Sequence, residues 1–166
     1  MNSRFIVLCL ILSTLLYPSC DPIEIDGPNP PDESQADLIG TWIAAGEDIA
    51  QNYWNEIDSI SLNFTSNNQY EWQQVNNDGS TILYNGTYAI DSGDLQIFPI
   101  VIAQLAPETA TYNGIYEINE SVNPLELSIE MVQTVPDIGQ EAPSYTEGFG
   151  SSSLGVDNIH RFIFLP

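Results

Sequence analysis

The sequence contains no lysine, and its only basic residues are Arg4 and Arg161, against 23 acidic residues among 166. The formal net charge is −21. Such a chain repels nucleic-acid phosphates, so we expect no nucleic-acid binding. It also repels anionic lipid head groups, so we expect any attachment to a membrane to be covalent.

Cysteine and histidine are scarce as well. Cys9 and Cys20 both lie in the first 20 residues, so the rest of the chain forms neither a disulfide nor a thiolate zinc site. Nucleophilic catalysis pairs a serine or cysteine with a histidine or lysine, and His160 is the only such base. We interpret His160 as a half-buried strand residue and expect no catalytic residue. The sequence has no calcium-loop or phosphate-loop pattern, so we predict no metal and no cofactor.

The chain does have an apolar run over residues 5–16, which follows Arg4 and is too short to span a bilayer. This pattern is typical of a signal peptide, which we place at residues 1–19. Its removal would leave 23 acidic residues against one arginine, a formal charge of −22. Residues 17–20, Tyr-Pro-Ser-Cys, resemble a lipobox, which implies acylation of Cys20 and an anchor in the cell envelope, at the outer membrane. An ordinary secretory peptide is the alternative.

Residues 20–37 are predicted to form a tether between this anchor and a folded domain. After Cys20 they contain four prolines, six acidic residues and no aromatic residue. Such a segment cannot bury enough apolar surface to fold, and proline keeps it extended. We therefore expect the domain to stand clear of the membrane.

Short alternating stretches dominate residues 38–166. Ile60, Leu62 and Phe64 alternate with polar residues, and a second such run covers residues 125–131. A period of two is the pattern of strands that bury one face. Turns rich in Asn, Asp and Gly separate the runs, and one turn of helix is expected within residues 47–54.

An internal repeat adds to this pattern, because residues 84–91 and 112–119 share Tyr-Asn-Gly-x-Tyr. Two similar hairpins in succession indicate an up-and-down meander. Gly86 and Gly114 within strands indicate bends or bulges where a sheet curls. We therefore predict that residues 38–166 form one all-β domain, a monomeric up-and-down antiparallel β-barrel.

The domain opens with a Gly-x-Trp motif at Gly40 and Trp42. This motif is similar to the start of the first strand in lipocalins and in bacterial lipocalin-like lipoproteins. The resemblance implies that Trp42 closes one end of the barrel and that an arginine of the last strand, here Arg161, packs over it. A guanidinium group stacked on an indole gains roughly 1 kcal/mol. We interpret Gly40, Trp42 and Arg161 as structural residues.

Aromatic side chains are the candidates for ligand binding. Most of those on strands should fill the barrel interior, and the rest would line a cavity. The long Pro-, Gly- and Ser-rich segment 134–157 is a second candidate region, whose aromatic residues would cover the barrel mouth; disorder without a binding role is the alternative. The candidate residues are Tyr70, Trp72, Tyr84, Tyr88, Tyr112, Tyr116, Tyr145 and Phe149.

Three functions stay open at this point. The leading hypothesis is a non-enzymatic, lipid-anchored binding module that takes a small apolar or aromatic-compatible ligand into the barrel. The rival is an interaction protein with a filled barrel, which contacts another envelope or host protein through its outer face or the 134–157 segment. A hydrolase that uses two carboxylates facing each other across a cleft is a third.

Overall fold

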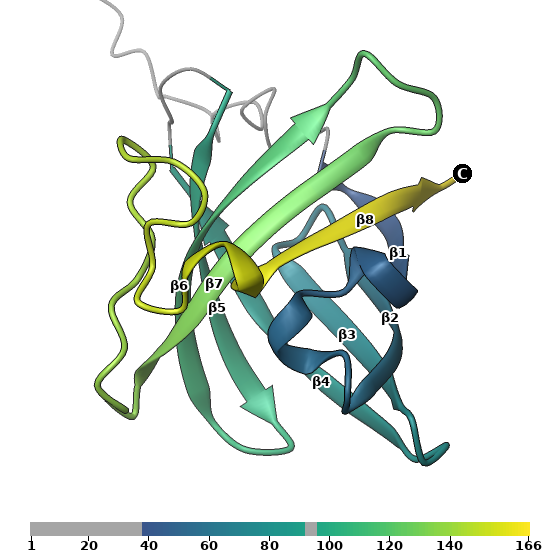
Figure 1. Ribbon diagram of the computed structural model, residues 1–166, viewed down its shortest axis with the longest axis horizontal. Helices are drawn as coiled ribbons and strands as arrows, with labels where there is room; N and C mark the ends of the chain where they lie inside the picture. Colours follow the sequence, from purple (N-terminus) through teal and green to yellow (C-terminus); the bar gives the residue numbers. More distant parts are fainter. Residues whose placement is uncertain (1–37, 92–95) are drawn as a thin grey trace, which may run out of the picture. The chain divides into compact units, whose positions relative to one another are not determined.

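The computed structural model describes residues 38–91 and 96–166, which form eight antiparallel strands and three short 3-10 turns (Figure 1). The predictions for the signal peptide at 1–19, for lipidation at Cys20 and for the tether at 20–37 lie outside these residues. The strands are β1 (Gly40–Ala45), β2 (Ile57–Phe64), β3 (Gln69–Asn76), β4 (Thr81–Ile90), β5 (Phe98–Ala106), β6 (Ala110–Asn119), β7 (Glu126–Val135) and β8 (Ile159–Leu165).

Each strand pairs with its neighbours in sequence, and β1 also pairs with β8, so the sheet closes into a barrel. The closing register aligns Trp42 with Phe164 and Ile43 with Ile163. Closure leaves no strand edge exposed. The predicted fold, an up-and-down antiparallel β-barrel, is confirmed. Within the two described ranges, no helix is long and apolar enough to cross a bilayer.

The 3-10 turns all lie at one end of the barrel. η1 (Gly46–Asp48) and η2 (Gln51–Tyr53) connect β1 to β2, where one turn of helix was predicted. η3 (Gly155–Asn158) leads into β8, and it contacts η2. These turns therefore lie beside the ends of the strands that they connect, on the same side as the β3–β4 and β5–β6 turns (Figure 1).

Gly86 and Gly114 face the barrel interior at points where neighbouring strands come very close. A Cβ atom on Gly86 would collide with the carbonyl oxygen of Ala103, and one on Gly114 would collide with that of Glu130. The β4–β5 register also shifts at Gly86, which marks a bulge. The glycines thus let the sheet curl tightly enough to close.

The opposite end of the barrel is closed by packed aromatic rings. Trp42 is fully buried, donates its indole N–H to the carbonyl oxygen of Leu38 at 2.9 Å, and meets the ring of Phe164 edge-on at 5.0 Å. Gly40 has a φ of +136°, and a Cβ atom there would lie 2.5 Å from the Phe164 ring. Only glycine combines this backbone conformation with room for the ring.

The prediction that Arg161 packs over Trp42 is wrong. His160 and Phe162 are buried inside the barrel, whereas Arg161, between them, is exposed on the outer wall opposite Ser128. Because alternate residues of a strand face opposite sides, an outward arginine cannot reach an inward tryptophan from this position. Phe164 supplies the ring that Trp42 contacts.

Residues 136–154, the main part of the predicted 134–157 segment, pack against the outer wall of β7. Glu130 is fully buried on that wall, and its carboxylate accepts backbone N–H groups of Gly150 at 2.6 Å and Ser152 at 3.1 Å. A buried carboxylate is costly unless such donors surround it. Glu130 is therefore the anchor of this segment, which Figure 1 shows alongside β6 and β7.

Candidate functional site

A cavity of about 190 Å³ lies inside the barrel at the end that carries the 3-10 turns. Its lining comes from inward residues of β2 to β8 and includes Tyr53 of η2 and Asn158 of η3, the turns at that end. The lining residues are Tyr53, Ile57, Tyr70, Trp72, Gln74, Tyr84, Ile102, Gln104, Tyr112, Met131, Asn158 and His160.

The volume limits what the cavity holds. Drug-sized molecules occupy sites of roughly 300–1,000 Å³. A cavity of about 150 Å³ is enough to bind benzene. The cavity in this barrel therefore matches a molecule with one ring and a few further atoms.

Four of the predicted ligand-binding residues line this cavity. Tyr70 and Trp72 reach it from β3, Tyr84 from β4 and Tyr112 from β6. Trp72 and Tyr84 lie directly opposite each other in the β3–β4 register. The structure thus brings together residues that are up to 42 positions apart in sequence, as residues 70 and 112 are.

Tyr88 and Tyr116, the second tyrosines of the repeat, do not line the cavity, which corrects their prediction as ligand-binding residues. Both are buried toward the closed end. Tyr88 meets Phe64 edge-on at 4.8 Å and donates its hydroxyl to the carbonyl oxygen of Thr65 at 2.9 Å. Tyr116 stacks on Phe98 at 5.4 Å. Both tyrosines are core residues.

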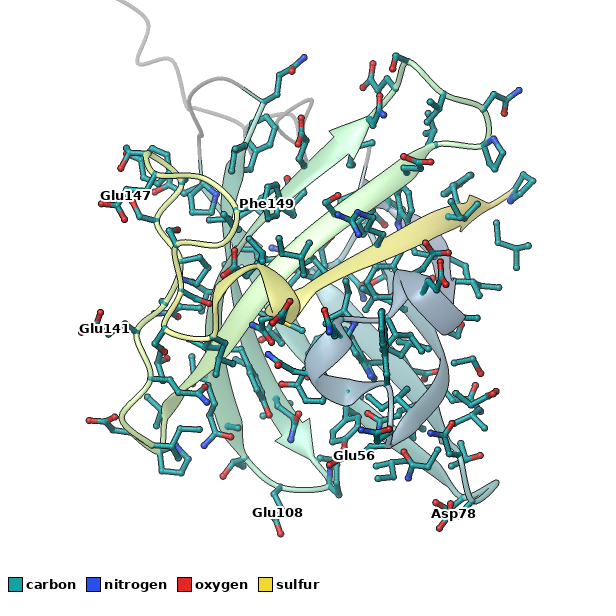
Figure 2. All side chains as sticks on the ribbon, viewed as in Figure 1. Glu56, Asp78, Glu108, Glu141, Glu147 and Phe149 are labelled. Atoms are coloured by element: carbon teal, nitrogen blue, oxygen red, sulfur yellow. The ribbon has the colours of Figure 1, made fainter. Side chains whose placement is uncertain are left out.

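Tyr145 and Phe149 do not cover the barrel mouth, so that prediction is wrong too. Both belong to the segment that packs on the outer wall, and neither is among the cavity residues. Figure 2 shows Phe149 well away from the end of the barrel that carries Glu108. The buried carboxylate of Glu130 accounts for this placement, because it binds the backbone on both sides of Ser151.

The tyrosine hydroxyls at the cavity have no protein partner among the described residues. Those of Tyr53, Tyr70, Tyr84 and Tyr112 form no hydrogen bond within residues 38–91 and 96–166. Burial raises the pKa of Tyr112, and the nearby phenols of Tyr84 and Tyr53 raise it further. Burial also raises the pKa of Tyr70, with a smaller contribution from Tyr112. The cavity is therefore lined by neutral phenols that lie close together and can both donate and accept hydrogen bonds.

His160 is the cavity residue that the sequence interpretation most underrated. It is buried rather than half-buried, and its Nδ1 accepts the backbone N–H of Ala50 at 3.2 Å. Tyr53 stacks on the imidazole at 5.6 Å and Trp72 meets it edge-on at 5.4 Å. Burial lowers the pKa of His160 to about 4, so the ring is neutral at physiological pH.

Sequence reasoning also missed the remaining lining residues, which are apolar or amide side chains apart from one tyrosine: Tyr53, Ile57, Gln74, Ile102, Gln104, Met131 and Asn158. Gln104 donates its amide to the carbonyl oxygen of Glu108 at 2.7 Å, and Gln74 donates to the side chain of Asn76 at 2.6 Å. The carbonyl oxygens of both amides accept no hydrogen bond from the described residues. Their inward parity with Tyr70 and Ile102 is a signal that would have identified them.

Charge is confined to the surroundings of the cavity. The described lining residues include no Asp, Glu, Lys or Arg, and the one histidine among them, His160, is neutral at physiological pH. Glu56, Asp78 and Glu108 lie at the same end of the barrel on the outside (Figure 2). An anionic ligand would meet this repulsion on approach and find no cation inside. The lining also offers no pair of facing carboxylates, the arrangement that a glycosidase-type hydrolase requires.

Comparison with known proteins gave no match: no protein-family model matches the chain, and no significant match was found among curated proteins or solved structures.

Proposed function

We propose that this chain is a lipid-anchored binding protein of the cell envelope, similar to lipocalin-like lipoproteins, that takes a small uncharged ligand into its barrel without catalysing a reaction. The observation that carries the proposal is the neutral polar-aromatic cavity at one end of a closed eight-stranded barrel. Eight-stranded barrels of this size either fill their interior with side chains or hold one small ligand. The Gly-x-Trp motif at the closed end, which resembles the start of the first strand in lipocalins, also supports this proposal.

The rival hypothesis, an interaction protein with a filled barrel, is weakened by the same cavity. Its interior would need packed side chains at both ends, whereas the tyrosine hydroxyls at one end have no described partner. The 136–154 segment, which would offer a contact surface, is itself held against the barrel by Glu130. We therefore keep ligand binding as the function that the geometry favours.

Native mass spectrometry of the protein purified from its own host tests the binding function. We expect a co-purifying small molecule with the wild type. Met131→Trp should reduce its occupancy, because Met131 lines the cavity and the larger ring would fill it. Leu83→Trp is the matched control, since Leu83 is exposed on the outer wall. Equal occupancy in Met131→Trp, or no bound molecule in the wild type, would argue against a ligand-binding barrel.

Detergent phase partitioning tests the anchor. The wild-type protein should enter the detergent phase, because acyl chains on Cys20 would attach it to lipid. Cys20→Ala should leave it in the aqueous phase. If both forms stay in the aqueous phase, Cys20 is not acylated and the ordinary secretory peptide is the better interpretation.

A further inference from the structure

The imidazole of His160 presents a hydrogen-bond donor to the cavity. Its Nδ1 accepts the backbone N–H of Ala50, and this bond places the proton of the neutral ring on Nε2. His160 points into the barrel and borders the cavity, and Nε2 is the ring nitrogen farther from the backbone. Among the described residues, Nε2 has no hydrogen-bond partner. A buried N–H group without an acceptor is costly, so a ligand that fills the cavity would have to supply one.

The environment of the ring fixes both its orientation and its charge. Tyr53 stacks on one face at an interplanar angle of 17°, and Trp72 lies nearly perpendicular at 85°. Burial keeps the pKa of His160 near 4, far below neutral pH. Nε2–H is therefore a hydrogen-bond donor of fixed orientation on a ring that stays uncharged across the physiological pH range.

His160 differs from the tyrosines of the cavity in its hydrogen-bonding capacity. A tyrosine hydroxyl donates and accepts, so the phenols suit many ligands equally. The free nitrogen of His160 only donates in this tautomer. It therefore favours a ligand that carries a hydrogen-bond acceptor. Because no Lys or Arg lines the cavity, this acceptor is expected to be uncharged.

We propose that the ligand is an uncharged one-ring molecule with a carbonyl-type acceptor, and that Nε2–H of His160 donates a hydrogen bond to that acceptor. The cavity volume limits the ligand to about one ring, the aromatic lining favours a planar ring, and the imidazole N–H requires a hydrogen-bond acceptor on the ligand. This inference rests on the proposed binding function and specifies the chemistry of its ligand.

Two probes of nearly equal shape test it by calorimetric titration of the full chain. Acetophenone carries a carbonyl oxygen, and α-methylstyrene replaces that oxygen with a methylene group that accepts no hydrogen bond. We expect the wild type to bind acetophenone about two- to tenfold more tightly, the range of one net hydrogen bond. If neither probe binds, the binding function itself fails. If both bind equally, the function stands and the role of His160 is overturned.

Two substitutions separate the hydrogen bond from the packing of the ring. His160→Gln places an amide N–H near the position of Nε2 and should keep the preference for acetophenone. His160→Asn places an oxygen near Nδ1, where it can accept the Ala50 N–H, but has no group at Nε2 and should bind the two probes equally. The ratio of the two affinities is the readout, because a general loss of cavity shape lowers both. A preference that persists in His160→Asn would overturn the proposal.

Discussion

The two ends of the barrel are built from the same kinds of side chain and differ in whether those side chains have protein partners. At the closed end, the indole N–H of Trp42 and the hydroxyl of Tyr88 both donate to backbone carbonyls. At the cavity end, the hydroxyls of Tyr84 and Tyr112 form no hydrogen bond with any described residue. Polar groups of folded proteins are nearly always hydrogen-bonded when buried. Partner satisfaction, rather than aromatic content, thus separates core from site in this protein.

The largest contrast between the ends should come from their tryptophans. Trp42→Ala removes a fully buried ring and its hydrogen bond, and we expect a loss of about 5 kcal/mol in the free energy of unfolding. Trp72→Ala removes a ring that already borders a cavity, so its cost should lie near the lower end of the usual range, about 3 kcal/mol. Urea unfolding followed by circular dichroism measures both. Equal losses would mean that the two ends are packed alike.

The buried imidazole at the cavity end should make stability depend on pH. The folded pKa of His160 is about 4 and the unfolded value about 6.5, so the unfolded chain alone gains this proton between these pH values. The free energy of unfolding should therefore fall by roughly 3 kcal/mol as the pH drops from about 6.5 to 4. Tyr53, the titratable group that stacks on the ring, stays neutral there, because a phenol loses its proton only near pH 10 and burial raises the pKa of Tyr53 further.

His160→Gln is the control for this pH effect, since glutamine does not titrate. The many carboxylates also respond to pH, but they are common to both proteins. The difference between the two unfolding curves over the pH range therefore isolates the imidazole. If the two proteins show the same pH dependence, the imidazole has the same pKa in the folded and the unfolded chain, and burial does not lower it.

A glycine at the closed end should tolerate substitution by alanine less well than a glycine in an open turn. Gly40→Ala meets both a strained φ of +136° and the Phe164 ring, and we expect it to cost about 2 kcal/mol. Gly79→Ala shares the positive φ, at +83°, but has open space around it and should cost about 1 kcal/mol. Thermal unfolding of both variants separates the ring collision from backbone strain. If the costs are equal, Phe164 moves aside freely.

Sequence periodicity predicts much of this fold and only part of this site. Alternation in stretches such as Ile60 to Phe64, together with the repeated Tyr-Asn-Gly-x-Tyr, predicted an up-and-down antiparallel barrel, which the strand order confirms. The same alternation left β8 undecided, because both of its faces are apolar. The Trp42–Phe164 register resolves it and places Arg161 outside.

The misassigned residues depend on contacts that are distant in sequence. Tyr84 and Tyr88 have the same local pattern, and only their positions along the barrel axis distinguish cavity from core. The outward position of Glu130 suggests an exposed carboxylate, yet a segment 20 residues later covers it and draws Phe149 away from the mouth. The local sequence pattern predicts neither the positions of the two tyrosines along the barrel axis nor the burial of Glu130.

The tyrosines of the first repeat give the smallest but cleanest test of the contrast between the ends. Tyr88→Phe removes one of the two donors to the carbonyl oxygen of Thr65, which keeps the backbone N–H of Asn68 at 3.2 Å, and should lower the free energy of unfolding by about 1 kcal/mol. Tyr84→Phe removes a hydroxyl with no described partner and should change it by less than about 0.5 kcal/mol. Both substitutions delete one oxygen from the same residue type, four positions apart on the same strand face. Urea unfolding of the pair thus compares a hydroxyl that has a backbone partner with one that has no described partner, and a larger loss for Tyr84→Phe would place an unrecognised structural hydrogen bond at the cavity.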